Sequence, residues 1–220
     1  MTKPSDRFGI KGTGDGQFNE PCSAACNVNG NIFVADVNNH RIQIFDEKGV
    51  FKSTFGRYGT GDGEFKYPIG VAIDKEGNYL VADEDNHRIQ VFDSTGKFLR
   101  KFGSEGTEKG QLKHPNGIGL LSNGNIVVSD YGNHRPQIFT PLGQFLSFVG
   151  LGMLKDPCDL YVGSEDHIYV ADTQNNRVLV FLQTGQLVKI LKTGELNPSG
   201  VCVDDEERVI VCGRNEVLIF

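Results

Sequence analysis

The stretch from Val34 to Phe45, which reads VADVNNHRIQIF, decides the fold because the chain repeats it. It returns almost unchanged as Val81–Phe92 and as Val128–Phe139, and a looser copy spans Val170–Phe181. A degenerate fifth copy runs over 211–220, and the equivalents of Asp36 are spaced by 47, 47, 42 and 41 residues. A period of this size is typical of a repeat architecture. A residue shared by most copies therefore serves the fold, and function is expected where the copies differ.

Each repeat reads as four short antiparallel strands. In the second copy the runs 70–73, 79–82, 89–92 and 97–102 are rich in β-prone residues and are separated by turns of Gly, Asn and Asp. Both faces of these strands carry apolar residues, so each sheet needs a neighbouring sheet on either side. Four-stranded antiparallel units that repeat in this way and pack face to face are the blades of a β-propeller. The sequence predicts an all-β propeller of four-stranded blades, with five repeats present.

The repeats divide a single domain, residues 1–220, into five blades. Their expected bounds are about 11–56, 57–103, 104–150, 151–192 and 193–220. Phe8-Gly9 aligns with Phe55-Gly56 at the end of a fourth strand, whereas Phe220 aligns with the end of a third strand. We therefore predict that residues 6–10 complete the fifth blade beside 217–220, which would remove two sheet edges.

Composition limits the classes of function. A hydrophobic fraction of 38% in 220 residues fits a folded domain, and a net charge of −6 without a basic run disfavours nucleic acid and anionic membranes as generic partners. No apolar run is long enough for a membrane helix, and the N-terminus lacks an apolar signal region, which predicts a cytoplasmic protein without a membrane partner. The five cysteines include no C-x-x-C pair, and we expect Cys26 and Cys202 to be reduced thiols at buried or half-buried apolar positions.

Three NHR segments and two linkers carry a resemblance to a known family. The segments are Asn38–Arg41, Asp85–Arg88 and Gly132–Arg135, and the linkers are Gly12–Phe18, followed by Pro21, and Gly59–Phe65, followed by Pro68. They resemble the NHL repeat family, and most of all the C-terminal propellers of tripartite-motif ubiquitin ligases. That resemblance implies a propeller that usually has six blades. The five repeats fit either a five-bladed propeller or part of a six-bladed, multidomain protein.

The resemblance also implies a function. It indicates a non-catalytic propeller that binds a protein partner or ubiquitination substrate for a tripartite-motif-type ubiquitin ligase, whose RING activity lies in segments absent from these 220 residues. An RNA-binding propeller that acts in post-transcriptional repression is the alternative. A metal-dependent propeller lyase or lactonase is a more distant one. We expect no catalytic residues, no cofactor, no metal and no small-molecule substrate.

Repeated polar residues are interpreted as structural. Each Asp–Arg pair is expected to clamp the loop between strands two and three by a charge-assisted hydrogen bond, because four copies cannot all be active sites. The repeated histidine is expected to pack or to hydrogen-bond between blades, and Asn176 replaces it in the fourth copy. The glycine-rich linkers lack the Lys-Ser/Thr of a phosphate loop. The expected clamps are Asp36 with Arg41, Asp83 with Arg88, Asp130 with Arg135, and Asp172 with Arg177.

Residues that differ between copies indicate a binding surface. The linkers and the loops between strands two and three are expected on one face, and their summed charge is −3, which is a poor generic platform for RNA. A local patch of aromatic and basic residues could still bind a partner, or read single-stranded RNA by stacking. The candidate binding residues are Arg57, Tyr58, Lys66, Tyr67, Lys113, His114, Tyr131 and Arg135.

Two departures from the repeat predict local changes. Pro136 stands where other copies have an apolar residue with a backbone donor, so we expect a bent or shortened third strand in that blade. The last copy has Gly213 in place of the motif Asp and lacks the Arg, so its loop should be the least clamped.

Overall fold

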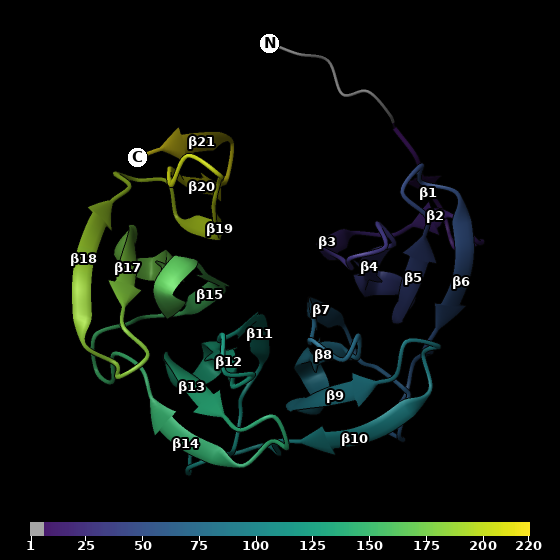
Figure 1. Ribbon diagram of the computed structural model, residues 1–220, viewed down its shortest axis with the longest axis horizontal. Coiled ribbons are helices and arrows are strands. Elements are labelled where there is room, and N and C mark those ends of the chain that lie inside the picture. The colour runs from purple at the N-terminus through teal and green to yellow at the C-terminus, as the bar shows by residue number, and fades with distance from the viewer. Residues whose placement is uncertain (1–6) are drawn as a thin grey trace. The chain divides into compact units, whose positions relative to one another are not determined.

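The computed structural model describes residues 7–220, and within that range the chain forms five successive antiparallel sheets and no α-helix (Figure 1). The first four sheets have four strands each, and the fifth has three. The chain forms two compact units, Met1–Lys101 and Phe102–Phe220. The predicted fold class, an all-β NHL-type propeller with antiparallel four-stranded blades and five repeats, is confirmed.

The first unit contains two four-stranded sheets and the short parallel pair β1-β2. Its strands are β1 (Ile10–Lys11), β2 (Gln17–Phe18), β3 (Pro21–Cys26), β4 (Ile32–Asp36), β5 (Arg41–Phe45), β6 (Phe51–Phe55), β7 (Pro68–Ile73), β8 (Tyr79–Asp83), β9 (Arg88–Phe92) and β10 (Phe98–Phe102), the last of which ends at the unit boundary. The sheet orders are β3-β4-β5-β6 and β7-β8-β9-β10. The short 3₁₀ turns η1 (Val37–Asn39) and η2 (Glu84–Asn86) join the second and third strands.

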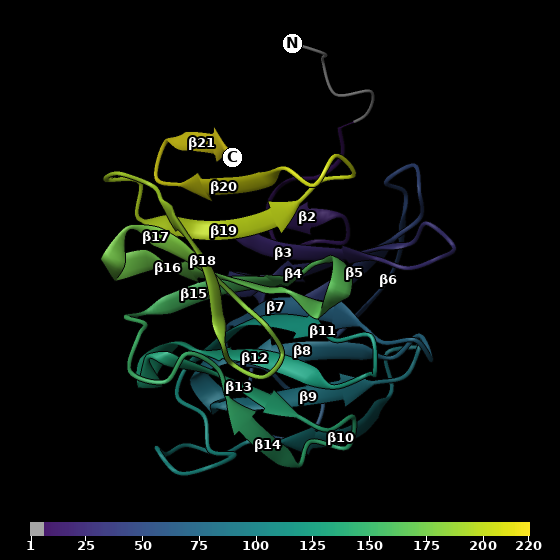
Figure 2. The ribbon, with the colours of Figure 1, turned by 60° about the vertical axis from the view of Figure 1, so that its left-hand side comes forward.

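The second unit contains three sheets. Its strands are β11 (Pro115–Leu120), β12 (Ile126–Asp130), β13 (Arg135–Phe139), β14 (Phe145–Phe148), β15 (Pro157–Val162), β16 (Ile168–Asp172), β17 (Arg177–Phe181), β18 (Leu187–Lys192), β19 (Pro198–Val203), β20 (Val209–Gly213) and β21 (Glu216–Ile219). The turns η3 (Tyr131–Asn133) and η5 (Thr173–Asn175) again join second and third strands, whereas η4 (Ser164–Asp166) joins β15 to β16. Figure 2 shows β19, β20 and β21 side by side in the fifth sheet.

The start of the described chain belongs in part to a linker. Ile10–Lys11 pairs in parallel with Gln17–Phe18, and equivalent parallel bridges join Tyr58 to Phe65 and Glu105 to Leu112. The predicted completing strand at residues 6–10 therefore overlaps this linker pairing at Ile10. Residue 6 lies outside the described residues, and completion of the fifth blade stays a prediction.

Aromatic and aliphatic side chains fill the space between successive sheets within each unit. In the first unit Phe33 lies 4.2 Å from Tyr79 between ring centres, and both are almost fully buried. In the second unit one cluster joins the third and fourth sheets through Val127 and Leu160, and another joins the fourth and fifth sheets. This packing on both faces explains why the middle strands are apolar on both sides.

Pro136 changes a neighbouring strand and not its own. β13 keeps five residues, so the predicted shortening of the third strand is wrong. Its outer neighbour β14 has only four and ends at Phe148, although the Val149 N–H still donates to the Pro136 carbonyl at 3.0 Å. Both polar groups of a strand residue point to the same side, so the missing proline N–H is one that would have bonded to β14.

The cysteines differ from the expectation. All are free thiols, but Cys22, Cys26, Cys202 and Cys212 are exposed, and only Cys158 is half-buried. The prediction of buried or half-buried positions is therefore wrong for Cys26 and Cys202. The four exposed cysteines lie on β3, β19 and β20, in the first sheet of one unit and the last of the other. An end sheet of a unit has a neighbour within that unit on one face only, so the repeat pattern overstates its burial.

No helix among residues 7–220 is long and apolar enough to cross a membrane.

A glycine in the turn between strands three and four allows close packing. Gly96 has φ +84°, and a Cβ there would fall 2.7 Å from the Phe55 ring of the preceding sheet. Gly77 has nearly the same φ, +82°, with no atom within 4 Å of its Cβ position. We predict that Gly77→Ala costs about 1 kcal/mol through backbone strain alone. Gly96→Ala should cost about 1–3 kcal/mol more, because the methyl group also displaces Phe55.

Urea denaturation of both variants measures this difference. Equal losses would show that Phe55 moves aside freely.

Candidate functional site

A buried carboxylate organises the loop of each of the first four sheets. Asp36 is fully buried at the end of β4. Its Oδ1 accepts a hydrogen bond from the Asn19 N–H at 2.7 Å, and its Oδ2 accepts from Asn39, Arg41 and Gln43 side chains at 2.9, 2.8 and 3.0 Å. Asp83 and Asp130 make the same four kinds of contact, and Asp172 lacks only the glutamine. We call this arrangement the aspartate clamp.

The clamp also holds the linker that enters each blade. The Arg88 guanidinium donates to the carbonyls of Thr60, Gly61 and Glu64, at 2.9, 2.7 and 2.9 Å. Gln90 donates to the Glu64 carbonyl at 2.7 Å and accepts from the Gly63 N–H at 2.9 Å. Sequence reasoning found the Asp–Arg pairs but missed the Asn and Gln members, although both recur within the repeat. One clamp thus fixes the turn, the third strand and the linker together.

Burial makes the clamp carboxylates dependent on their partners. Burial raises the pKa of Asp83, and hydrogen bonds from Lys66 N–H, Asn86 and Arg88 oppose that rise. Burial likewise raises the pKa of Asp130, and the corresponding bonds from Lys113 N–H, Asn133 and Gln137 oppose it. A buried carboxylate that loses its cation keeps the desolvation cost without compensation.

We predict that Arg88→Ala destabilises the protein by about 3–5 kcal/mol, because it strands a buried carboxylate and frees three linker carbonyls. The matched variant is Arg177→Ala. Its side chain is 29% exposed against 8% for Arg88, and it holds one linker carbonyl, that of Met153. The second variant should lose about 1–3 kcal/mol.

Chemical denaturation of both variants provides the test. A larger loss for Arg177→Ala would contradict the role given to burial.

Within each unit, the residue at the repeated histidine position connects one blade to the next. His40 has φ +54°, and its Nδ1 accepts a hydrogen bond from the Tyr67 N–H at 3.2 Å. His134 accepts in the same way from the Asp156 N–H at 3.2 Å, and the Asn176 side-chain oxygen accepts from the Asn197 N–H at 2.8 Å. The three donor residues each precede a proline and have positive φ. Asn176 can therefore replace the histidine because its oxygen makes the same bond.

Burial lowers the pKa of His40, and the negative charge of Asp83 partly opposes that effect. A protonated Nδ1 could not accept the Tyr67 N–H. The native state therefore takes up a proton at lower pH than the unfolded chain does. The stability from this contact is complete above the ordinary histidine pKa of 6.5 and is lost as the pH falls below it.

We predict that His40→Asn reduces the loss of stability on acidification, since asparagine keeps the acceptor and does not titrate in this range. The reciprocal change, Asn176→His, should increase that loss. Unfolding free energies measured between about pH 8 and about pH 5 give both slopes. Unchanged slopes in both variants would contradict the assignment.

Two candidate binding residues of the first unit pack against His40, and a third lies over one of them. The His40 ring lies 5.0 Å from the Tyr58 ring and 4.8 Å from the Tyr67 ring, both edge-on. The Lys66 Nζ lies 5.8 Å from the centre of the Tyr58 ring. Tyr58 is 63% exposed and Tyr67 is 38% exposed. We call His40, Tyr58, Lys66 and Tyr67, together with Arg57, the tyrosine cluster.

The positive charge of Arg57 is already engaged. Its guanidinium binds the Glu64 carboxylate with contacts of 2.9 and 2.8 Å. Glu64 also accepts from the Gly61 N–H, and this bond, followed by the one from Arg57, lowers the pKa of Glu64. Asp62 pairs with Lys101 at 2.6 Å. The cluster is thus aromatic with little net charge, which suits a protein surface better than a phosphate backbone.

The four candidates of the second unit are more tightly tied to the fold. Lys113 donates its N–H to Asp130 at 2.7 Å, and its carbonyl accepts from the Gly132 N–H at 2.8 Å. A Cβ at Gly132 would fall 2.7 Å from Lys113 Cγ, so the Lys113 stem covers the turn that Tyr131 begins. His114 has φ +49° before Pro115.

Arg135 belongs to the clamp. It bonds to Asp130 and to the carbonyls of Thr107 and Glu108, and its guanidinium lies 4.3 Å from the Phe148 ring centre. Its side chain is 12% exposed, which leaves little of it for a partner.

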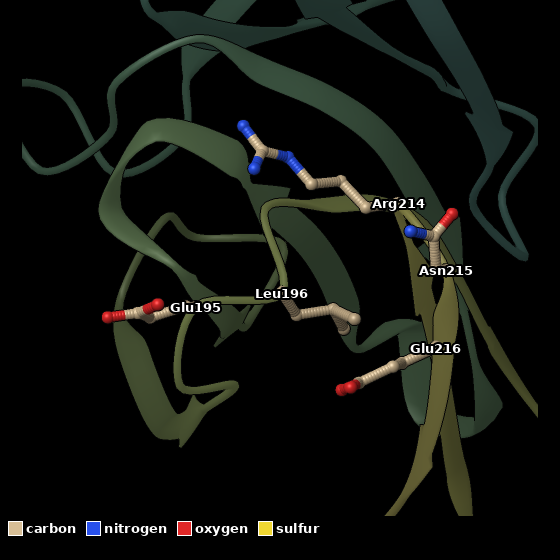
Figure 3. A pocket seen from close by; sticks show the side chains of 5 residues that line it. All are labelled: Glu195, Leu196, Arg214, Asn215 and Glu216. Atoms are coloured by element: carbon tan, nitrogen blue, oxygen red, sulfur yellow. The ribbon is translucent and has the colours of Figure 1, made fainter.

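The fifth blade has a small pocket where the clamp is missing. The pocket has a volume of about 270 Å³ and is lined by Glu195, Leu196, Arg214, Asn215 and Glu216 (Figure 3). Figure 3 shows Glu195 directed away from Asn215 and Glu216. Gly213 takes the place of the motif Asp, and a Cβ there would fall 2.5 Å from the Leu196 carbonyl. Residues 214–216 make no side-chain hydrogen bond or ion pair within residues 7–220, as expected for an unclamped loop.

Comparison with known proteins identifies the class. The model of the NHL repeat matches residues 18–45, 65–92, 112–139 and 154–181, which is 112 of the 220 residues. These four matches are the four clamped repeats. The chain belongs to the NHL repeat family.

Particular relatives match over shorter stretches. The chain is 55% identical over 49 residues to protein brain tumor of Drosophila melanogaster and 56% identical over 46 residues to the B-box type zinc finger protein ncl-1 of Caenorhabditis elegans. It is 45% identical over 49 residues to human tripartite motif-containing protein 2. These matches cover 21–22% of the chain and only 5–7% of the relatives.

Solved structures with the same fold have different activities. A streptogramin B lyase superposes with a TM-score of 0.71 at 18% identity and covers 91% of this chain and 68% of its own. A gluconolactonase from Xanthomonas campestris gives 0.73 at 17% identity, with 90% and 71% covered. At this identity the likeness shows the fold alone.

Proposed function

We propose that this chain is a non-catalytic recognition propeller whose tyrosine cluster binds a protein partner. The observation that carries the proposal is the pair of exposed tyrosines, Tyr58 and Tyr67, whose rings both pack edge-on against His40, with Lys66 over the Tyr58 ring. Tyrosines of this kind supply large contact area with few rotatable bonds, as in the centres of protein interfaces. Tyr67 is fixed by the His40 hydrogen bond and by its positive φ, so little ordering is needed on binding.

The similarity to tripartite motif-containing protein 2 supports a finer proposal. The chain would act in the cytoplasm as the partner- or substrate-binding part of a tripartite-motif-type ubiquitin ligase. RNA binding is the second candidate, favoured by the Lys66–Tyr58 contact, since a base can stack beside a cation. The balanced charge of Arg57, Asp62 and Glu64 with their partners weighs against it.

Photo-crosslinking distinguishes the two candidates. With p-benzoylphenylalanine in place of Tyr58, we expect a discrete protein crosslink in cell extract that survives RNase and that Tyr67→Ala reduces at least about tenfold, as for loss of an interface anchor. The same group at Val28, an exposed position of the same unit, should not give that crosslink.

Filter binding to a pool of short RNAs at physiological ionic strength is the opposing measurement. Submicromolar RNA affinity that Lys66→Ala and Tyr67→Ala abolish, with no RNase-resistant crosslink, would overturn the protein-binding proposal.

A further inference from the structure

The second unit has a second cavity, which is larger than the pocket beside Arg214 and is lined by none of the tyrosine-cluster residues. It has a volume of about 350 Å³ and lies between the fourth and fifth sheets. The loops beside it join the first and second strands of these sheets, whereas the clamped loops join the second and third strands. In an antiparallel sheet these connections lie at opposite strand ends. Its lining residues are Ser164, Glu165, His167, Tyr169, Val180, Val188, Lys189, Val203, Glu207 and Val209.

Apart from Lys189, the floor of this cavity is apolar. Tyr169 pairs with Val180, and Val180 pairs with Lys189, so these three side chains share one face of the fourth sheet. The fifth sheet contributes the cross-strand pair of Val203 and Val209. Val180 is 3% exposed, whereas the Tyr169 ring is only half-buried. The floor therefore suits the methylene stem of a long side chain.

The rim of the cavity is acidic. The loops 163–167 and 204–208 carry net charges of −2 and −3. Arg208 is occupied by Asp204 and Glu206, at 2.7 and 3.2 Å. Glu165 and Glu207 make no ion pair or side-chain hydrogen bond within residues 7–220. Neither lining carboxylate is paired, and the lining, which also includes Lys189, carries a net charge of −1. Burial, together with Glu207 and Tyr161, raises the pKa of Tyr169.

Glu207 stands where the first three repeats place glycine. It has φ +62°, and its equivalents Gly30, Gly77 and Gly124 have φ of +76°, +82° and +86°. The fourth repeat has Asp166 at this position, with φ +60°, and its carboxylate accepts two hydrogen bonds from Ser122 at 2.6 and 2.7 Å. Asp166 thus has a structural use. Glu207 has the same strained backbone and no such bond.

We propose that this cavity binds an arginine side chain of a protein partner, with the guanidinium paired with Glu207 and stacked on the Tyr169 ring. A planar guanidinium can pair with a carboxylate and stack on an aromatic ring at once, which an ammonium does less well. The net charge of the rim supplies the complementarity. This surface is separate from the tyrosine cluster, so its failure would leave the proposed function untouched.

NMR titration of the ¹⁵N-labelled chain tests the proposal. N-acetyl-L-arginine methylamide is the ligand, and the citrulline analogue, neutral and nearly isosteric, is its control. We expect arginine to shift the amides of Glu165, Tyr169, Val203 and Glu207, with a dissociation constant on the order of millimolar, and citrulline to bind more weakly. Glu207→Gly should weaken arginine binding about three- to fivefold and leave folding stability equal or higher.

Two further variants complete the test. Glu207→Gln removes the charge at nearly constant size and should weaken binding as Glu207→Gly does. Asp205→Asn removes a charge from the same loop outside the lining and should change affinity less than about twofold. Equal binding of arginine and citrulline, or equal effects of Asp205→Asn and Glu207→Gln, would overturn the proposal. It would also be overturned if N-acetyl-L-lysine methylamide bound more tightly than the arginine ligand, or if the shifts were confined to other surfaces.

Discussion

The buried aspartate at the end of each second strand is the constraint on which the rest of this structure depends. A carboxylate without water is unfavourable unless several donors satisfy it. Asp36 collects its donors from a linker N–H, the following turn and the third strand. One residue therefore determines the path of three chain segments in each of the first four repeats. The fifth repeat has glycine in that place, and its loop borders a pocket instead.

The histidine contact extends this order from one blade to the next. His40 and Tyr67 are 27 residues apart, and both have left-handed backbone conformations that cost free energy. The structure retains them because a ring nitrogen satisfies a backbone donor at the start of the next sheet. The same contact places the two exposed tyrosines in a fixed geometry. A structural bond and a candidate binding surface thus share one side chain.

The two candidate surfaces arise where the repeats differ. Tyr58 and Tyr67 occupy linker positions that the clamp leaves unspecified, and Glu207 occupies a turn position where the other repeats have glycine or a bonded aspartate. Residues of the shared motif form their hydrogen bonds and ion pairs within the fold, and Arg135 therefore exposes little surface to a partner. Residues that differ between the repeats and have no structural role are therefore the most informative about where this chain binds a partner.

The sequence by itself determined the period, the order of strands, the Asp–Arg pairs and the family, because these depend on residues only a few positions apart. The clamp pairs, for example, are five residues apart on neighbouring strands of one hairpin. Only the tertiary structure decided the exposure of Cys26 and Cys202, the shortening of β14 beside Pro136, the gathering of aromatic rings around His40, and the cavity beside Glu207. Each of these depends on which sheet face a neighbour covers, or on contacts between segments distant in the chain. A period repeated along a chain predicts what the copies have in common, whereas their packing decides what each copy exposes.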